Sequence, residues 1–400
     1  MLWVTFAAAV AIIGVIAVGA VVGSPAKWNG GCGDDGRFYC QLTEGKVVPQ
    51  PYNQRVLVPW LVHLIAGRGG LPGGFFLVNL FSLIAIAAAT WVLTRRVAIG
   101  LGASIGRQKA AAATAAALAL AAPMALRFTA FYPTLVDHPA LALELLWLVA
   151  ITHPRSWVGI AGGVLPALAI LARESSIGTI AIVAGPLIFI SRRHRLVALS
   201  SLAVCIPALA LVLSRPALHS LSFLPFIRKN IIALFTVRVA ATNLVWATMI
   251  TFGLLPWIVT RAHVSLRAAL RDEHTAPLIV ALIAAILAPF VIVVLAGADV
   301  ARYLYPAIPP TLALALGAAA SEPKLDPLVG GATAATLVLA RPFQVLDGSR
   351  LAYFQSFSPY YLRENRVYHR FIADLAVVVG CIASVLAVQV ARRARTSRIS

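Results

Sequence analysis

Two adjacent carboxylates, Asp34 and Asp35, lie in the stretch CGDDGRFYC between Cys32 and Cys40, shortly after the first long apolar run. Because neighbouring carboxylates repel each other, one of them tends to keep its proton or to recruit a cation. Such a group can act as a general base when a substrate hydroxyl is placed within hydrogen-bond reach. Asp and Gly also favour turns for conformational reasons, so a plain turn is an alternative interpretation of this loop.

The segment that follows the acid pair is predicted to form a short amphipathic helix. Polar and aromatic residues recur there at helical spacing, opposite an apolar set that includes Val56, Leu57 and Leu61; they are Tyr52, Arg55, Pro59, Trp60 and His63. A helix of this pattern lies in the membrane interface, with Trp and Arg at the depth of the headgroups. It serves either as a platform for a lipid substrate or as an anchor.

Asp137 and His138 precede another apolar run and form a second candidate site. Asp137 is equally suited to cap a helix, with Pro139 in its first turn. Glu144 follows seven residues later and therefore shares a helical face with Asp137. A carboxylate inside a membrane is costly, so we expect Glu144 to face a polar cavity or a partner.

Two further pairs of opposite charge lie at the ends of apolar runs. Arg173 and Glu174 are adjacent and either neutralise each other or contribute to a site. Asp299 and Arg302 are three residues apart, a spacing that favours an ion pair on one helical face. Arg302 next to Tyr303 at an interface also suits the binding of a phosphate, because guanidinium groups make bidentate contacts to phosphate.

The composition identifies an integral membrane protein. Hydrophobic residues make up 60% of the chain. Charged residues make up 12%, which is about half of their share in an average soluble domain. The chain contains 33 Lys and Arg residues but only 14 Asp and Glu residues, which gives a formal charge of +19. These cations are placed in short loops between apolar runs, as membrane insertion requires. We therefore expect no nucleic-acid partner.

The apolar runs predict an all-α polytopic bundle of about twelve transmembrane helices in a single domain over residues 1–400. A membrane-spanning helix needs about 20 mostly apolar residues. The first run lacks a basic leading region and is long for a signal peptide, so we interpret it as an anchor. The runs cover residues 2–23, 74–94, 109–126, 139–152, 157–172, 176–191, 196–214, 240–260, 276–296, 304–320, 327–341 and 371–391.

The distribution of basic residues predicts the orientation. Clusters of Arg follow alternate runs and close the chain, so both termini are expected in the cytoplasm. Residues 24–73 then form the first extracytoplasmic loop and residues 342–370 the last. Arg55, Arg173 and Arg302 lie on the outer side against this bias, which makes them candidates for binding an anion.

Cys32 and Cys40 lie in the first outer loop, where an oxidising compartment permits a disulfide. Free thiols are the alternative. A zinc site is disfavoured because two thiols without a second pair of ligands do not complete a four-ligand site.

The acid pair after the first helix and the segment Pro51-Tyr-Asn-Gln-Arg-Val-Leu-Val-Pro-Trp60 resemble the GT-C superfamily of integral-membrane glycosyltransferases. The segment from Asp299 to Tyr305 is similar to segments of many bacterial members. The resemblance implies a polyprenyl-phosphate sugar donor, an outward-facing active site in the bacterial plasma membrane, and a catalytic acid at Asp34 or Asp35. The chain departs from many members in lacking a large C-terminal extracytoplasmic domain.

In the mechanism that this resemblance implies, Asp35 or Asp34 takes the proton of an acceptor hydroxyl while the sugar is transferred with inversion. Arg55, Arg302 and Arg173 are expected to stabilise the departing lipid phosphate, since preorganised cations matter most where charge develops. A divalent metal that bridges carboxylate and phosphate is compatible with this scheme. The alternatives are a transporter or flippase of lipid-linked or anionic solutes that uses Glu144, and a non-catalytic partner in envelope assembly.

Overall fold

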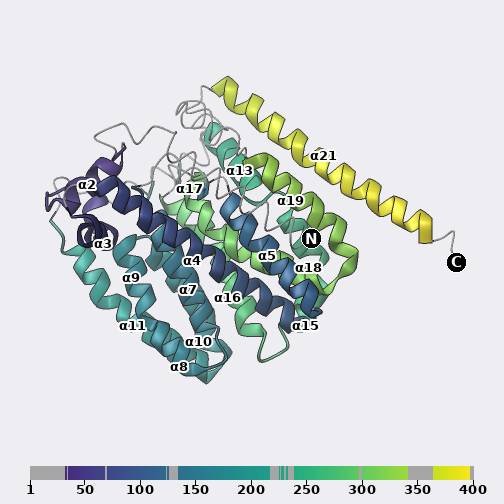
Figure 1. Ribbon diagram of the computed structural model, residues 1–400, viewed down its shortest axis with the longest axis horizontal. Coiled ribbons are helices and arrows are strands. Elements are labelled where there is room, and N and C mark those ends of the chain that lie inside the picture. Colours follow the sequence, from purple (N-terminus) through teal and green to yellow (C-terminus); the bar gives the residue numbers. More distant parts are fainter. Residues whose placement is uncertain are drawn as a thin grey trace.

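The protein is helical throughout the residues that the structure describes, with no strand among them (Figure 1). This computed structural model describes residues 32–33, 35–67, 70–122, 124–125, 134–216, 225, 227–228, 231–232, 238–296, 300–340 and 364–396.

The elements run in chain order from a short helix near the N-terminal end to a long C-terminal helix. They are α2 (Gly36–Thr43), η2 (Tyr52–Gln54), α3 (Leu57–Ala66), α4 (Leu71–Gly100), α5 (Ile105–Ala121), α7 (Asp137–Ile151), α8 (Ser156–Ala161), η3 (Gly162–Val164), α9 (Leu165–Ala172), α10 (Ser176–Ile190), α11 (Arg192–Leu213), α13 (Arg238–Phe252), α14 (Leu255–Arg261), α15 (His263–Ala269), α16 (Ala276–Ala296), α17 (Val300–Leu304), η4 (Tyr305–Ala307), α18 (Ile308–Ser321), η5 (Pro323–Leu325), α19 (Asp326–Ala340) and α21 (Glu364–Thr396).

The prediction of an all-helical chain with several apolar spans is confirmed for this part of the chain. Five described helices are long and apolar enough to cross a membrane, or six if the pair α13 and α14, bent by 69°, counts as one span. The described residues do not confirm the predicted number of about twelve, and three of the helices at predicted runs, α7, α10 and α19, have only 15 residues each. At about 1.5 Å per residue such helices reach about 22 Å, less than the ~30 Å hydrocarbon core. The first predicted run, 2–23, lies outside the described residues.

Two predicted runs are interrupted in the structure. The run 157–172 is divided into α8, the single turn η3 and α9, which share an axis with Gly162 and Gly163 at the division. The run 240–260 bends between α13 and α14, where Gly253 has a positive φ of 47° that favours a residue without Cβ.

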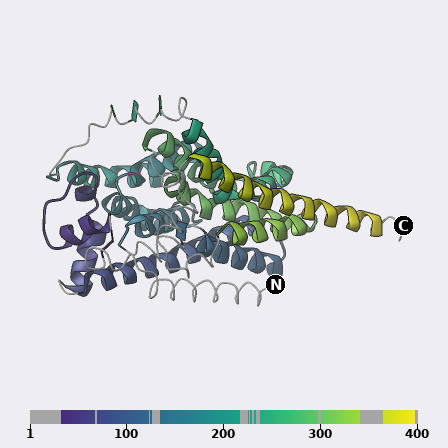
Figure 2. The same ribbon diagram turned by 90° about the horizontal axis from the view of Figure 1, so that it is seen from above.

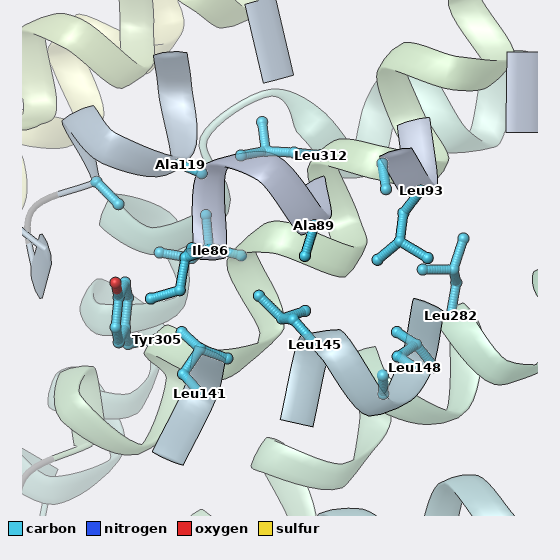
Figure 3. Packing of buried hydrophobic residues seen from close by; sticks show 14 of the residues in the cluster. Ile86, Ala89, Leu93, Ala119, Leu141, Leu145, Leu148, Leu282, Tyr305 and Leu312 are labelled. Carbon is cyan, nitrogen blue, oxygen red and sulfur yellow. The ribbon is translucent and has the colours of Figure 1, made fainter. Parts of the chain in front are cut away.

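The centre of the bundle is α4, which packs against α5, α7 and α18. Figure 3 shows Ile86, Ala89 and Leu93 of α4 facing leucines of α7, and all of these side chains are buried. The α5 face against α4 consists largely of alanines, including Ala115 and Ala119. Small residues let helix backbones approach closely, which is how helices associate inside a membrane.

The last helix, α21, packs on α13 and α19 as far as buried Val385, and its C-terminal end extends away from the bundle (Figures 1 and 2). Inside the contact, the indole Nε1 of Trp246 donates a hydrogen bond of 2.8 Å to Oδ2 of Asp374. Both side chains are buried. A polar pair of this kind fixes the position of one helix on another in an apolar environment.

We expect Gly317→Val to destabilise the fold through the contact between α18 and α4. A Cβ on Gly317 would lie 2.7 Å from Cβ of Val97 and 3.0 Å from the carbonyl oxygen of Thr94, so the helices would have to separate. Overpacking typically costs about 1–3 kcal/mol. Thermal unfolding in detergent measures this loss. Gly330→Val is the matched control, because a Cβ on Gly330 of α19 meets nothing within 4 Å; an equal loss in the control would contradict the packing argument.

Candidate functional site

Six charged residues from distant parts of the chain meet at one end of the bundle. We call them the ion-pair network; they are Asp35, Arg55, Asp137, Arg173, Glu174 and Arg302. They are carried by the start of α2, the junction of η2 and α3, the first residue of α7, the turn between α9 and α10, and α17. Figure 1 shows α2 and α3 together at one edge of the bundle, and α3 also contacts α9.

Asp137 is held by two arginines. Arg302 donates to both carboxylate oxygens, from Nε to Oδ1 at 2.9 Å and from Nη2 to Oδ2 at 2.8 Å. Nη1 of Arg173 lies 2.8 Å from Oδ1, and the same guanidinium lies 4.9 Å from the centroid of the Tyr303 ring. The Asp137 side chain is only 1% exposed. Two charge-assisted contacts thus compensate the cost of burying this carboxylate.

Arg55 and Glu174 form a second, bidentate pair. Nε and Nη2 of Arg55 donate to the two oxygens of Glu174 at 2.7 and 2.8 Å, and Nη1 donates to the hydroxyl oxygen of Tyr39 at 2.6 Å. Burial raises the pKa of Glu174, but the charge and hydrogen bonds of Arg55 outweigh it, so the pKa lies below its usual range. Burial likewise raises the pKa of the Tyr39 hydroxyl, which therefore stays protonated.

Asp35 is the most exposed carboxylate of the network. Its side chain is 44% exposed, and Oδ2 lies 3.7 Å from Nη1 of Arg302. The hydroxyl of Tyr52 donates a hydrogen bond of 2.8 Å to Oδ1. Burial and the Asp35 charge raise the pKa of Tyr52, so this hydroxyl remains a donor. The arrangement leaves Asp35 as a carboxylate that is oriented from two sides and still open to solvent.

The loop that carries Asp35 is fastened at several points. Cys32 and Cys40 are joined by a disulfide. The hydroxyl of Thr134 donates to the carbonyl oxygen of Cys32 at 2.8 Å, just before α7 begins. A Cβ on Gly36 would lie 1.8 Å from that same hydroxyl oxygen, so only glycine fits there. The start of α2 is thereby held against the segment that positions Asp137.

Four of the five residues predicted to supply the base or to contact the phosphate lie together in the network, but not all of their partners were predicted; they are Asp35, Arg55, Arg173 and Arg302. Arg173 and Glu174 do not neutralise each other, because they point to Asp137 and Arg55 respectively. The Arg55 side chain is only 5% exposed and is paired with Glu174. Asp34 and Asp299, the remaining predicted acids, lie outside the described residues.

The predicted interfacial helix is shorter than the sequence pattern indicates. Tyr52 belongs to the single turn η2, and Arg55 follows it in a non-helical conformation, so neither continues into α3. α3 begins at Leu57 and exposes Trp60, while Val58 and Val62 are buried. The break is what turns Arg55 inward to Glu174.

His138 lies beside the network and not within it. It is buried, and Nδ1 is 3.3 Å from the hydroxyl of Tyr305, with the two rings in an edge-to-face arrangement. Glu144 is buried further along the same face of α7, where it lines a small cavity together with Thr179, Pro306 and Pro310. We expected Glu144 to face a polar cavity or a partner, whereas the lining of this cavity is mostly apolar and includes Leu141, Leu145 and Leu148.

Tyr39 is the residue of this site that the sequence interpretation missed. It is fully buried between Arg55 and the ring of Tyr52, whose centroid lies 5.5 Å away. Its position four residues after Asp35 places it on the same face of α2, and this spacing is the signal that could have found it. Within the described residues, no group of three or more His, Cys, Asp or Glu side chains could hold a metal ion.

Comparisons with protein-family models, with curated proteins and with solved structures find no match to this chain. The likeness to GT-C glycosyltransferases therefore depends on the residues described above.

Replacing Cys32 and Cys40 by Ser should lower the free energy of unfolding. The disulfide closes a loop of sequence separation 8, and chain entropy assigns such a loop on the order of 2–3 kcal/mol. Denaturant unfolding with and without reductant measures the effect. Reductant should not affect the double variant, and Cys205→Ser serves as a control because Cys205 is a buried free thiol. Equal stability of the double variant and the unmodified protein would show that the disulfide does not stabilise the fold.

Glu174→Gln should destabilise the protein at pH 7 by about 3 kcal/mol, because removing one partner leaves a buried Arg55 without its counter-charge. The pKa of Glu174 is lower in the folded state than in the unfolded state. The stability contributed by the Glu174 charge is therefore fully present above the pKa of glutamate in the unfolded state, about 4.3. It is lost as the pH falls below that pKa.

Unfolding of both proteins between pH 7 and pH 3 tests this expectation. The difference in free energy of unfolding between the unmodified protein and Glu174→Gln should become smaller as the pH falls through this range. A gap that stays constant would show that the charge of Glu174 is not what stabilises the pair. Glu44→Gln is the control, since Glu44 pairs with Lys46 at the surface and such pairs contribute about 0–1 kcal/mol.

Proposed function

We propose that this protein is a glycosyltransferase of the bacterial plasma membrane, with both termini cytoplasmic, that transfers a sugar from a polyprenyl-phosphate donor to an acceptor hydroxyl on the extracytoplasmic face. The observation that supports it is the environment of Asp35. This carboxylate is half-exposed, oriented by the Tyr52 hydroxyl, and 3.7 Å from an arginine that is itself anchored on buried Asp137. A general base and an anion-binding cation thus lie side by side.

In the proposed reaction, a carboxylate oxygen of Asp35 accepts the proton of the acceptor hydroxyl. The acceptor oxygen forms a bond to the anomeric carbon while the bond from that carbon to the phosphate oxygen breaks. The electron pair leaves with the lipid phosphate, and a single displacement inverts the anomeric carbon. Arg302, whose side chain is 15% exposed, is the cation placed to contact the departing phosphate.

The other arginines have a supporting part in this proposal. Arg55 has its guanidinium occupied by Glu174 and Tyr39, and Arg173 is almost fully buried on Asp137. Both are too enclosed to reach a lipid headgroup without losing these contacts. They position Asp137 and the α9–α10 turn, and Asp137 in turn holds Arg302 in place.

The rival function, transport of a lipid-linked or anionic solute, is favoured by one observation, the cavity beside buried Glu144. A carboxylate that faces a cavity inside a helical bundle is typical of an ion or proton path. Asp137 does not extend this path, because two arginines hold it as a fixed anion.

Asp35→Asn should reduce sugar transfer by about 10²–10⁴-fold, the usual contribution of a general base. Arg302→Lys should also reduce turnover, since lysine keeps the positive charge but loses the bidentate contact by which Asp137 holds Arg302 in place. The measurement is donor consumption by purified variants in lipid, with a panel of polyprenyl-phosphate sugars. Glu44→Gln is the control, because it removes a surface carboxylate at the end of α2.

Thermal unfolding of each variant separates a loss of activity from a loss of fold. Normal turnover of folded Asp35→Asn and Arg302→Lys, together with an inactive Glu144→Gln, would favour the transporter over the enzyme. Normal function of all three in cells would leave a structural role in envelope assembly.

A further inference from the structure

A second group of cations lies at the other end of α7. Asp137 begins this helix and His153 follows its last turn, so 15 residues, or about 22 Å, separate this end from the ion-pair network. We call the group the basic cluster; it consists of Arg96, His153, Arg155 and Arg193, which come from α4, the α7–α8 connection and α11.

The basic cluster is drawn together by the C-terminal carbonyl groups of α7. Nη1 of Arg96 donates to the carbonyl oxygen of Val149 at 2.8 Å, and Nη2 of Arg193 donates to the carbonyl oxygen of His153. The backbone N–H of Arg155 donates to Nδ1 of His153 at 3.0 Å. Burial and the charges of the three arginines lower the pKa of His153, which is consistent with their proximity.

The cluster differs from the ion-pair network in its charge balance. The network combines three arginines with three carboxylates. Among the residues that the structure describes, no carboxylate forms an ion pair with Arg96, Arg155 or Arg193. Nε of Arg193 is buried and has no hydrogen-bond partner. Positive charge that is gathered and partly desolvated without a counter-ion favours the binding of an anion.

Apolar side chains surround the cluster and face outward. Trp157 and Ile160 of α8 are 64% and 61% exposed, and Leu196 of α11 is 61% exposed. The two helices are in close contact, since a Cβ on Gly159 would lie 2.9 Å from Cγ1 of Val197. Trp at the edge of an apolar surface is typical of the boundary between hydrocarbon and headgroups. The anion that meets this surface must therefore carry acyl chains.

From these observations we propose that the basic cluster binds the phosphate of an anionic phospholipid, at the end of α7 opposite the ion-pair network. The guanidinium groups of Arg155 and Arg193 contact the headgroup, and the acyl chains lie along α8 and α11 beside Trp157 and Leu196. Arg96 holds the end of α7 in place. The proposal is independent of the reaction assigned to Asp35.

The test measures lipid retention by the purified full-length protein, using native mass spectrometry after exchange into mixed micelles of phosphatidylglycerol and phosphatidylcholine. The unmodified protein should retain phosphatidylglycerol selectively. Each arginine near a membrane surface contributes about a 5-fold preference, so Arg155→Gln with Arg193→Gln should lose about 25-fold. Arg155→Lys with Arg193→Lys should keep most of the selectivity, because the charge remains. Since it changes the same two positions, it is the matched variant that separates loss of charge from loss of fold.

Two controls show whether a loss of phosphatidylglycerol selectivity is specific to the basic cluster. Arg267→Gln removes one charge from an exposed position on α15 and should leave selectivity unchanged. Inorganic phosphate at millimolar concentration should not displace the lipid. Unchanged selectivity of the double glutamine variant, an equal loss in Arg267→Gln, or displacement by inorganic phosphate alone would each overturn the proposal.

Discussion

The arrangement of the candidate site depends on one buried carboxylate. Asp137 is almost completely removed from solvent, and a carboxylate in this position is tolerated only with strong compensation. Arg302 and Arg173 provide it from two sides, which ties α17 and the α9–α10 turn to the start of α7. Removal of Asp137 would take from Arg173 and Arg302 the buried counter-charge that they share. The geometry around Asp35 follows from this contact, because Arg302 reaches Asp35 only while Asp137 fixes it.

Much of the helical framework could be predicted from the sequence. In the part of the chain that the structure describes, each apolar run coincides with a helix or a broken helix, because a long, mostly apolar segment has no other way to satisfy its backbone in a membrane. The interruptions were not predicted. The break in the run 157–172 and the bend at Gly253 depend on the packing of neighbouring helices, which hydropathy does not report.

The members of the candidate site were predictable, but their pairing was not. Arg55, Arg173 and Arg302 were singled out because they lie on the predicted outer side, against the bias of basic residues towards the cytoplasm. For Glu174, neutralisation by its sequence neighbour Arg173 was one of two alternatives, and it does not hold because Arg173 pairs with Asp137. The true partner, Arg55, lies 119 residues away, and Arg302 and Asp137 are 165 residues apart. Pairs so far apart along the chain are determined by how the helices pack, and no local sequence pattern predicts them.

These long separations have a consequence for how the protein is made. Chains emerge N-terminus first, so Arg55, Asp137, Arg173 and Glu174 are all synthesised before the ribosome reaches Arg302. Asp137 can meet Arg173, 36 positions further along the sequence, as soon as α9 is complete, whereas its second arginine arrives only with α17, near residue 300. Until α17 has been synthesised, Arg173 is the only one of its two arginine partners that this carboxylate can meet. The ion-pair network can therefore be completed only after α17, the segment that leads into α18, has been synthesised.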